Sequence, residues 1–140
     1  MSLQIGPTDD VDSCLALRHA VFVVEQGVSL EDEVDGHDGR AHHILARLNG
    51  VPVGCARILI KDDTGKIGRV CVLPSSRGTG LGSALIKACL THLRKQKDVR
   101  RALLGSQTHA IAFYEKLGFV AFGPEYDDAG IPHRDMDLSL

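Results

Sequence analysis

Residues 67–82, IGRVCVLPSSRGTGLG, join an apolar run to a glycine-rich turn. The run from Ile67 to Leu73 predicts a strand, and the pattern from Leu81 to Leu93 predicts an amphipathic helix. A strand, a glycine turn and a helix start in direct succession aim free backbone N–H groups and the positive end of the helix dipole at one point. We therefore expect an anion site here, with a phosphate or pyrophosphate as its usual ligand.

The spacing of the glycines separates this turn from two better-known phosphate motifs. Glycines at positions 78, 80 and 82 let the backbone approach a ligand with no Cβ in the way. A Walker loop would place Lys and then Ser or Thr after its last glycine, but Ser83 and Ala84 follow Gly82. A dinucleotide loop reads G-x-G-x-x-G, whereas this chain reads G-x-G-x-G. A glycine-rich turn without a ligand is the remaining alternative.

The composition fits one domain, residues 1–140. A chain of 140 residues, with 44% hydrophobic and 24% charged residues, has ordinary values for a soluble protein. A formal net charge of −2 gives no support for a nucleic-acid or anionic-membrane partner. No apolar run approaches the roughly 20 residues that span a bilayer, and no signal sequence is visible. The expected compartment is the cytoplasm.

The cysteines and histidines do not predict a metal site or a disulfide framework. Four cysteines lie far apart in apolar stretches, at Cys14, Cys55, Cys71 and Cys89. They are expected to be buried small hydrophobes in a reducing compartment. The seven histidines show no His-Glu-x-x-His spacing. No metal is expected.

Strand and helix patterns alternate, which predicts a mixed α/β domain. A helix is expected to start at Pro7-Thr8-Asp9-Asp10 and to stop at Gly27, and the acidic stretch 29–41 is expected to be a loop. Another helix is expected at His109–Leu117, and a loop through Pro132. Strands are expected at Leu3–Ile5, His43–Leu48, Val51–Ile60, Ile67–Leu73, Ala102–Leu104, Phe119–Phe122 and Asp135–Leu138.

A second informative segment is AIAFYEKLGF, Ala110 to Phe119. Its helical spacing presents Tyr114 to the interior, where a core tyrosine is the plain alternative to a catalyst. Arg77, Gly80 and Gly82 also fit the spacing Arg/Gln-x-x-Gly-x-Gly. With these two segments the chain resembles the GCN5-related N-acetyltransferases (GNAT), and the resemblance runs from about Val11 onward. Marks that resemble the ElaA-like branch of this family are Leu17-Arg18, Val21 to Gln26, Glu33-Val34-Asp35-Gly36, Ala41-His42-His43 and Gly130-Ile131-Pro132-His133.

The resemblance implies a fold and a set of site residues. The fold is a central, mostly antiparallel twisted sheet of about six to seven strands, flanked by about four helices. Acetyl-coenzyme A is the implied cosubstrate, with Tyr114 near its sulfur to protonate the departing thiolate, and with a backbone amide of Cys71 or Val72 as the oxyanion donor. The implied coenzyme-binding residues are Cys71, Val72, Arg77, Gly78, Thr79, Gly80, Leu81, Gly82, Ser83 and Phe113.

The general base has several candidates. Glu25 follows the apolar face of the first helix, where a carboxylate beside apolar walls can have a raised pKa; pairing with Arg18 as a structural ion pair is the alternative. His43 leads a strand and is expected to face the cleft. His133 is expected to lie on the late loop, and His109 precedes the Tyr114 helix, where capping or flanking that helix is the plain alternative. A single histidine is more often a surface or structural residue than a catalytic one. The acidic stretch from Glu31 to Asp38 either attracts a cationic amine or is a solvated loop.

Two classes of function remain open. The first is an N-acetyltransferase that moves an acetyl group from acetyl-coenzyme A to a primary amine of a small molecule or peptide, by direct attack through a tetrahedral intermediate. The second is a non-catalytic module that binds or senses acyl-coenzyme A. Retention of Tyr114 beside a complete glycine loop favours the enzyme. Neither nucleic acid nor membrane is an expected partner, and a homodimer is compatible with the sequence.

Overall fold

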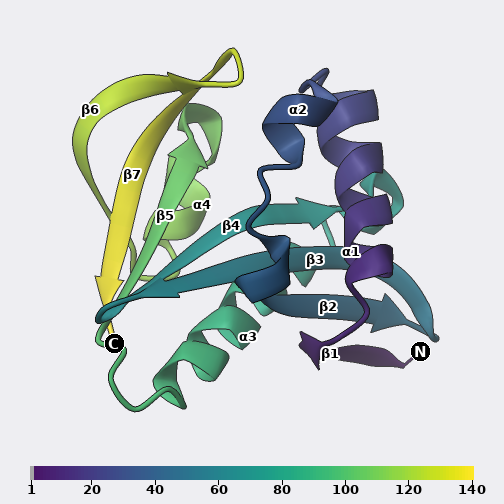
Figure 1. Cartoon of the computed structure of the whole chain (residues 1–140), viewed down its shortest axis with the longest axis horizontal. Helices are drawn as coiled ribbons and strands as arrows, with labels where there is room; N and C mark the ends of the chain where they lie inside the picture. Colours follow the sequence, from purple (N-terminus) through teal and green to yellow (C-terminus); the bar gives the residue numbers. More distant parts are fainter. Residues whose placement is uncertain (1) are drawn as a thin grey trace.

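A computed structural model describes residues 2–140. Its centre is a seven-stranded sheet in the order β1-β2-β3-β4-β5-β7-β6 (Figure 1). All neighbouring strands are antiparallel except β4 and β5, which are parallel. The strands are β1 (Leu3–Thr8), β2 (His42–Leu48), β3 (Val51–Lys61), β4 (Thr64–Val72), β5 (Arg101–Gln107), β6 (Val120–Asp128) and β7 (Ile131–Ser139).

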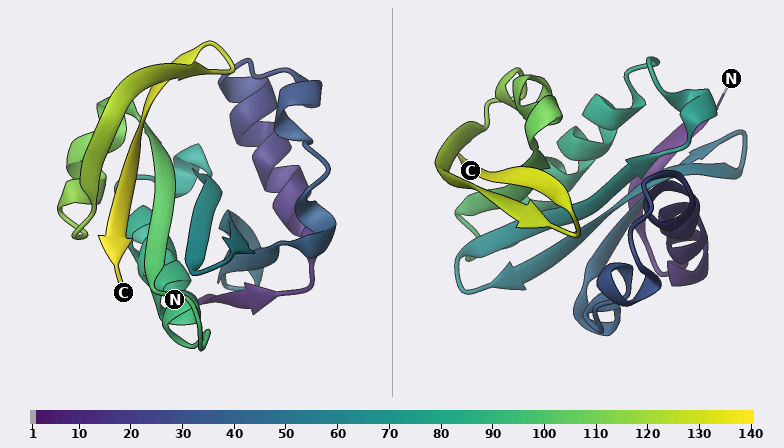
Figure 2. Two further views of the ribbon diagram at one scale, coloured as in Figure 1. Left: turned by 60° about the vertical axis from the view of Figure 1, so that its left-hand side comes forward. Right: turned by 90° about the horizontal axis from the view of Figure 1, so that it is seen from above.

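Helices cover both faces of the sheet. Helices α1 and α2 lie on one face and α3 and α4 on the other, as the view from above shows (Figure 2). The α-helices are α1 (Val11–Arg18), α2 (Leu30–Glu33), α3 (Leu81–Arg94) and α4 (Ile111–Glu115). A π-helical segment, His19–Glu25, continues α1, and 3-10 turns occupy Asp38–Arg40, Pro74–Ser76 and Thr108–Ala110. Within residues 2–140, no helix is long and apolar enough to cross a membrane.

Each face of the sheet has its own apolar core. Under α3 the core is large, because the helix turns a stripe of apolar side chains onto the sheet at helical spacing. The buried residues of this stripe are Leu81, Leu85, Ile86, Cys89, Leu90 and Leu93. Under α1 the core is smaller and consists of Cys14, Leu17, Val21, Leu45, Cys55 and Cys71. All four cysteines are buried and free, so the expectation that they pack as small hydrophobes is confirmed.

Strands β4 and β5 separate halfway along their length. They pair from Thr64 opposite Arg101 only as far as Ile67 opposite Leu104. Just beyond, β4 contains a bulge. Gly68 is paired with Arg57 and Cys71 with Cys55, so β4 has one residue more than β3 between these two pairs. Arg69, inside this bulge, has a left-handed φ of 52°. A bulge bends its strand, so β4 leaves β5 here and opens a gap at the centre of the sheet.

Several predicted boundaries are wrong, each for a local reason. Pro7 and Thr8 belong to β1, and α1 begins at Val11, because the Asp10 carboxylate caps the helix by accepting from the Ser13 N–H. The stretch 29–41 contains α2 and a 3-10 turn rather than a loop alone. Pro132 lies inside β7, and the β6–β7 hairpin turns instead at Ala129-Gly130, both with positive φ.

Candidate active site

The predicted anion site is an open cradle of backbone amides between β4 and α3. Gly78 and Gly80 are left-handed, with φ of 76° and 84°, and a Cβ on either would meet no atom within 4 Å. Arg77 N–H is bonded to Pro74 and Ala84 N–H to Gly80, but in residues 2–140 the amides of residues 78–83 have no backbone acceptor. These amides and the start of α3 therefore offer an anion several donors at once.

Side chains around this cradle shape it without filling it. The Thr79 hydroxyl donates to the Ser76 carbonyl oxygen at 2.5 Å and so braces the turn. Phe113 on α4 is 38% exposed and lies beside the cradle, where a Cβ on Gly82 would come within 3.5 Å of its ring. Leu81 is buried and anchors α3 in the core, while Ser83 is half-buried in the first helical turn. An apolar ring beside the amides suits a ligand with an anionic part and an apolar part.

Val72 presents its amide to the gap between β4 and β5. The Leu73 N–H donates to the Val53 carbonyl oxygen at 2.9 Å. Bonded and non-bonded pairs alternate along an antiparallel ladder, so Val72, opposite Gly54, points its N–H away from β3. Because β5 has already separated from β4, no strand within residues 2–140 receives this N–H. Of the two predicted oxyanion donors, Val72 has the better-placed amide, and the Cys71 side chain packs in the core, 3.5 Å from Cys55 Sγ.

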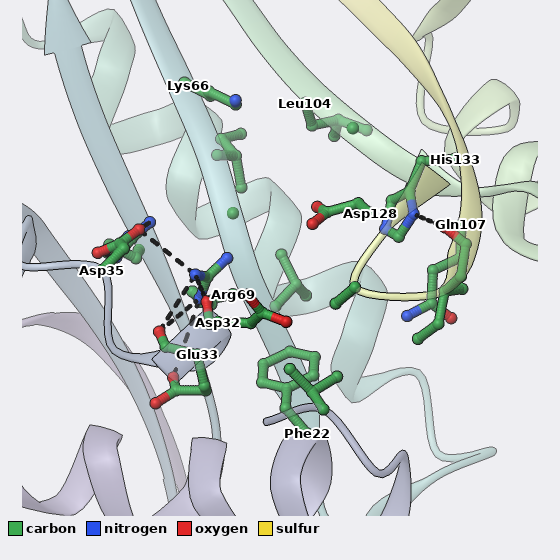
Figure 3. A pocket seen from close by; sticks show the side chains of 18 of the residues that line it. Phe22, Asp32, Glu33, Asp35, Lys66, Arg69, Leu104, Gln107, Asp128 and His133 are labelled. Atoms are coloured by element: carbon green, nitrogen blue, oxygen red, sulfur yellow. Dashed lines mark hydrogen bonds and ion pairs between the residues drawn. The ribbon is translucent and has the colours of Figure 1, made fainter. Parts of the chain in front are cut away.

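A cavity of about 540 Å³ occupies the gap on the α1–α2 side of the sheet (Figure 3). Its floor is the separated part of β4 and β5. One wall is the acidic segment, which we define as residues 30–38, and the opposite wall comes from the β6–β7 hairpin. Among the residues that line the cavity are Asp32, Glu33, Asp35, Arg57, Arg69, Gln107, Tyr114, Tyr126, Asp128 and His133.

Tyr114 reaches this cavity from α4. Its ring packs edge-on against Phe113 and Phe119, with centroids 5.0 and 6.0 Å apart. In the described part of the chain its hydroxyl makes no hydrogen bond, so this phenol is not a satisfied structural donor. Burial, with the nearby Cys89, raises the pKa of Tyr114 to about 12. The phenol is therefore neutral near neutral pH, as an ordinary tyrosine is, and it is a weaker acid than one.

The acidic segment is held to the sheet by three arginines. Arg18 on α1 is 1% exposed and bonds Glu33 at 2.5 Å and Asp38 at 2.7 Å. Arg57 holds Asp35 with two bonds of 2.8 Å. The Arg57 guanidinium keeps the pKa of Asp35 well below its ordinary value. Ion pairs therefore fix the carboxylates of Glu33, Asp35 and Asp38, while Glu31, Asp32 and Val34 of the segment remain exposed to solvent.

Arg69, from the β4 bulge, completes this attachment. Its guanidinium donates to the Asp32 and Glu33 carbonyl oxygens at 3.0 and 3.1 Å and to the Asp35 carboxylate at 3.3 Å (Figure 3). Burial, and then the charge of Arg57, lower the pKa of Arg69. The bulge that opens the sheet thus also ties down the cavity wall.

Glu25 does not have the environment expected from the sequence. Its carboxylate makes two 2.6 Å bonds to Arg77, and this hydrogen bonding lowers its pKa rather than raising it. The alternative pairing with Arg18 is also wrong. The π-helical turns after Arg18 are wider than α-helical ones, so seven residues no longer return Glu25 to the same face. In this structure Arg77 is held by Glu25 and by the Val72 carbonyl oxygen.

His43 does not face the cleft, which corrects the second prediction for the base. It is only 5% exposed and does not line the cavity. Its Nε2 lies 3.0 Å from the Asp38 carbonyl oxygen, which can only accept, so Nε2 carries the proton. The remaining Nδ1 is buried with no partner among residues 2–140. His43 therefore donates a hydrogen bond to the backbone of the acidic segment at Asp38.

His133 and His37 are the two histidines, among residues 2–140, that line the cavity. The sequence placed His133 on a late loop, but it lies in β7, opposite Gln107 of β5. The signal that would have placed it is the Ala129-Gly130 turn, which makes residues 120–139 one hairpin. His109, by contrast, is exposed and bonds Gln107 at 2.7 Å.

Comparisons with known proteins agree with this geometry. A family model described as an acetyltransferase (GNAT) domain matches residues 13–140. The protein ElaA of Escherichia coli (strain K12) is 39% identical over 127 residues, which cover 87% of this chain and 82% of ElaA. The crystal structure of Escherichia coli ElaA has a TM-score of 0.84 at 34% identity and covers 97% of each chain. An acyl-CoA N-acyltransferase from Pseudomonas aeruginosa has a TM-score of 0.87 at 33% identity and covers 97% of this chain and 99% of that chain.

These matches confirm two predictions made from the sequence. The resemblance to the GNAT acetyltransferases and to their ElaA-like branch is confirmed. The predicted mixed α/β fold with a mostly antiparallel sheet and helices on both faces is confirmed as well. Within residues 2–140, no group of three or more His, Cys, Asp or Glu side chains is arranged to hold a metal ion.

Proposed function

The chain belongs to the GNAT acetyltransferase family, and on that premise we propose that it transfers an acetyl group from acetyl-coenzyme A to a primary amine of a small molecule or peptide. The observation that carries this proposal is the group of amides at residues 78–83, which follow β4, start α3 and have no backbone acceptor within residues 2–140. Helix α4 places Phe113 beside Gly82 and brings Tyr114 to the cavity.

The cradle and the gap fit coenzyme A in two respects. The free amides at the start of α3 match the negative charge of a pyrophosphate, and the open space above Gly78 and Gly80 leaves room for it. The gap between β4 and β5 offers unpaired strand backbone to an extended arm that carries amides. Phe113 supplies an apolar contact beside the loop. We assign Arg77 a secondary role, because Glu25 already holds its guanidinium.

The reaction needs three things from the protein. The Val72 N–H would stabilise the oxyanion of the tetrahedral intermediate, a contribution of roughly 3–4 kcal/mol for one well-placed donor. Tyr114 would give its proton to the departing thiolate, because its side chain lines the cavity and its hydroxyl makes no hydrogen bond within residues 2–140. The amine would enter from the α1–α2 side, between the acidic segment and the β6–β7 hairpin.

We place this activity in the cytoplasm, because four buried free thiols suit a reducing compartment. For the acceptor we propose a monoamine or a peptide amine small enough to enter a cavity of about 540 Å³. Homodimerisation remains compatible with the chain.

The test is release of free thiol from acetyl-coenzyme A in the presence of a broad panel of amines, with the acetylated product identified by mass spectrometry. Thiol release that depends on one class of amine would support the enzyme. Tight binding of coenzyme A by calorimetry, with no thiol release for any amine, would instead establish a non-catalytic binding module.

A further inference from the structure

We propose that His133 is the general base that removes a proton from the acceptor ammonium. This inference rests on the proposed acetyl transfer and adds the group which that reaction lacks. His133 is half-buried and lines the cavity from the β6–β7 hairpin (Figure 3). It faces the acidic segment across the space that an entering amine would occupy.

A hydrogen bond fixes the neutral tautomer of His133 that carries its proton on Nδ1. Its Nδ1 lies 2.8 Å from the Ile131 carbonyl oxygen. A carbonyl oxygen only accepts hydrogen bonds, so Nδ1 must carry the proton. In the neutral ring, Nε2 then holds the lone pair, and within residues 2–140 it has no hydrogen-bond partner. The imidazole is therefore prepared to accept a proton at Nε2.

Tyr126 holds the ring of His133 in place. The two rings are stacked, with centroids 5.9 Å apart and planes 23° from parallel. Tyr126 is itself fixed, because its hydroxyl donates to the Asp135 carboxylate at 2.7 Å. Gly105 on β5 leaves the space for this hydroxyl, since a Cβ there would collide with it. An oriented base with a second group that orients it is the usual arrangement of a catalytic histidine.

The other ionisable groups around the cavity are less suited. Glu33 and Asp35 are occupied by arginines, and His37 is bonded to Arg40. Asp32 and Asp128 are exposed, and within the described residues their carboxylates make no hydrogen bond or ion pair. Carboxylates ordinarily titrate near pH 4 and are weak bases for an ammonium at neutral pH, whereas imidazole titrates close to neutrality. The charged side chains that line the cavity with His133 are Asp128 on its own hairpin and, on the other elements, Asp32, Glu33, Asp35, Arg57, Lys66 and Arg69.

The proton and bond changes balance. The ammonium gives one proton to His133 Nε2, and the free amine attacks the thioester carbon, forming the C–N bond. As the tetrahedral intermediate collapses, the C–S bond breaks, the thiolate takes the Tyr114 proton and the nitrogen releases its second proton to solvent. Solvent restores the Tyr114 proton and accepts the one held by His133, so one proton is released per turnover.

The test compares pH–rate profiles of kcat/KM for the wild type and His133→Asn. An asparagine amide can keep the bond to the Ile131 carbonyl oxygen but cannot take up a proton. We expect a rate about 10²–10⁴-fold lower at neutral pH, a lost acidic limb and unchanged affinity for coenzyme A. The deficit should shrink as the pH approaches the point at which the amine loses its own proton. His19→Asn, an exposed histidine outside the cavity, is the matched control and should behave as the wild type.

Two results would overturn the assignment. The first is an acidic limb retained by His133→Asn, and its loss in Asp128→Asn instead would assign the base to Asp128. The second is a deficit of the same size at every pH, which would mark a structural role. If His133→Asn does not fold, His133→Gln provides the same comparison. A wild type that acetylates no amine would instead refute the proposed function, before His133 is tested at all.

Discussion

The two sides of the gap between β4 and β5 are built in different ways. On the proposed coenzyme side, from β4 to α3, the working groups are backbone amides whose positions follow from glycines and a helix start, and α4 adds the phenol of Tyr114. On the acceptor side, the wall is a short acidic segment whose position depends on Arg18, Arg57 and Arg69, from three other elements. The amides of the first side lie close together in the sequence, whereas the wall of the second side depends on contacts between residues that are far apart in the sequence.

Because of this difference, substitutions are expected to change the two parts of the site to different extents. Backbone amides cannot be changed by most substitutions, so the coenzyme side can keep one ligand while side chains vary. The acceptor wall consists of side chains and carbonyl groups held by charge, so single substitutions can reshape it. We infer that side chains of the acidic segment and of the β6–β7 hairpin determine which amine this chain accepts.

The largest expected effect concerns Tyr114, because it tests whether the coenzyme side supplies chemistry as well as binding. Tyr114→Phe keeps the ring packing against Phe113 and Phe119 and removes only the proton donor. We expect kcat to fall by about 10²–10⁴-fold, with little change in coenzyme A affinity or thermal stability. Steady-state kinetics, calorimetry and thermal unfolding measure the three quantities. A loss of stability at unchanged rate would show that the hydroxyl is structural.

The next largest effect is expected on the acceptor side, from loss of Arg18. Arg18→Met would leave the buried carboxylate of Glu33, 3% exposed, without its main partner. Removing one member of a buried ion pair costs about 3–5 kcal/mol, so the free energy of unfolding should fall by about that amount. The matched control is Arg47→Met, which breaks the half-exposed Arg47–Asp10 pair and should leave the protein nearly as stable as the wild type. Equal losses in both variants, measured by urea unfolding, would contradict this view of the acidic segment.

These two sides also differ in how much of them could be predicted from sequence. The glycine turn, α3 and Tyr114 could be predicted because their signals lie within a few consecutive residues. The partner of Arg18 could not, because Glu33 and Asp38 are brought to it by a π-helical segment and a β-bulge that leave no clear mark in the sequence. His133 was misplaced for a related reason: one missed hairpin turn moved it from a strand to a loop.

A smaller effect is expected when the cradle itself is deformed. Gly80 has a φ of 84°, a conformation that costs other residues roughly 1–2 kcal/mol. Gly80→Val should therefore distort the turn and weaken coenzyme A binding by about tenfold, while the fold persists. Gly39→Ala is a suitable control, because Gly39 has no positive φ and open space around it. Unchanged affinity of Gly80→Val in calorimetry would remove the pyrophosphate from this turn.

Acid should weaken the attachment of the acidic segment through Asp35. Its pKa in the folded protein is held below the value of 3.8 by Arg57, so its stabilising contribution is complete well above pH 4 and declines as the pH falls below that value. The difference in Tm between the wild type and Asp35→Asn should therefore be constant from about pH 5 to 7 and narrow toward pH 3. Asp62→Asn, in an exposed turn, should show no such narrowing. A difference that widens on acidification would reverse the sign of the linkage.

The smallest effect is expected where the two sides touch, at the Glu25–Arg77 ion pair. Both side chains are about 40% exposed, at 39% and 42%, so the pair is partly screened by solvent. Glu25→Gln would free Arg77 to approach a bound pyrophosphate, and we expect coenzyme A to bind about twofold to fivefold more tightly at low salt. The gain should vanish in an Arg77→Gln background if it acts through that guanidinium, and shrink in both backgrounds at high salt if it is general electrostatics. Weaker binding by Glu25→Gln would mean that Glu25 holds Arg77 in its working position, so that the ion pair belongs to the coenzyme site.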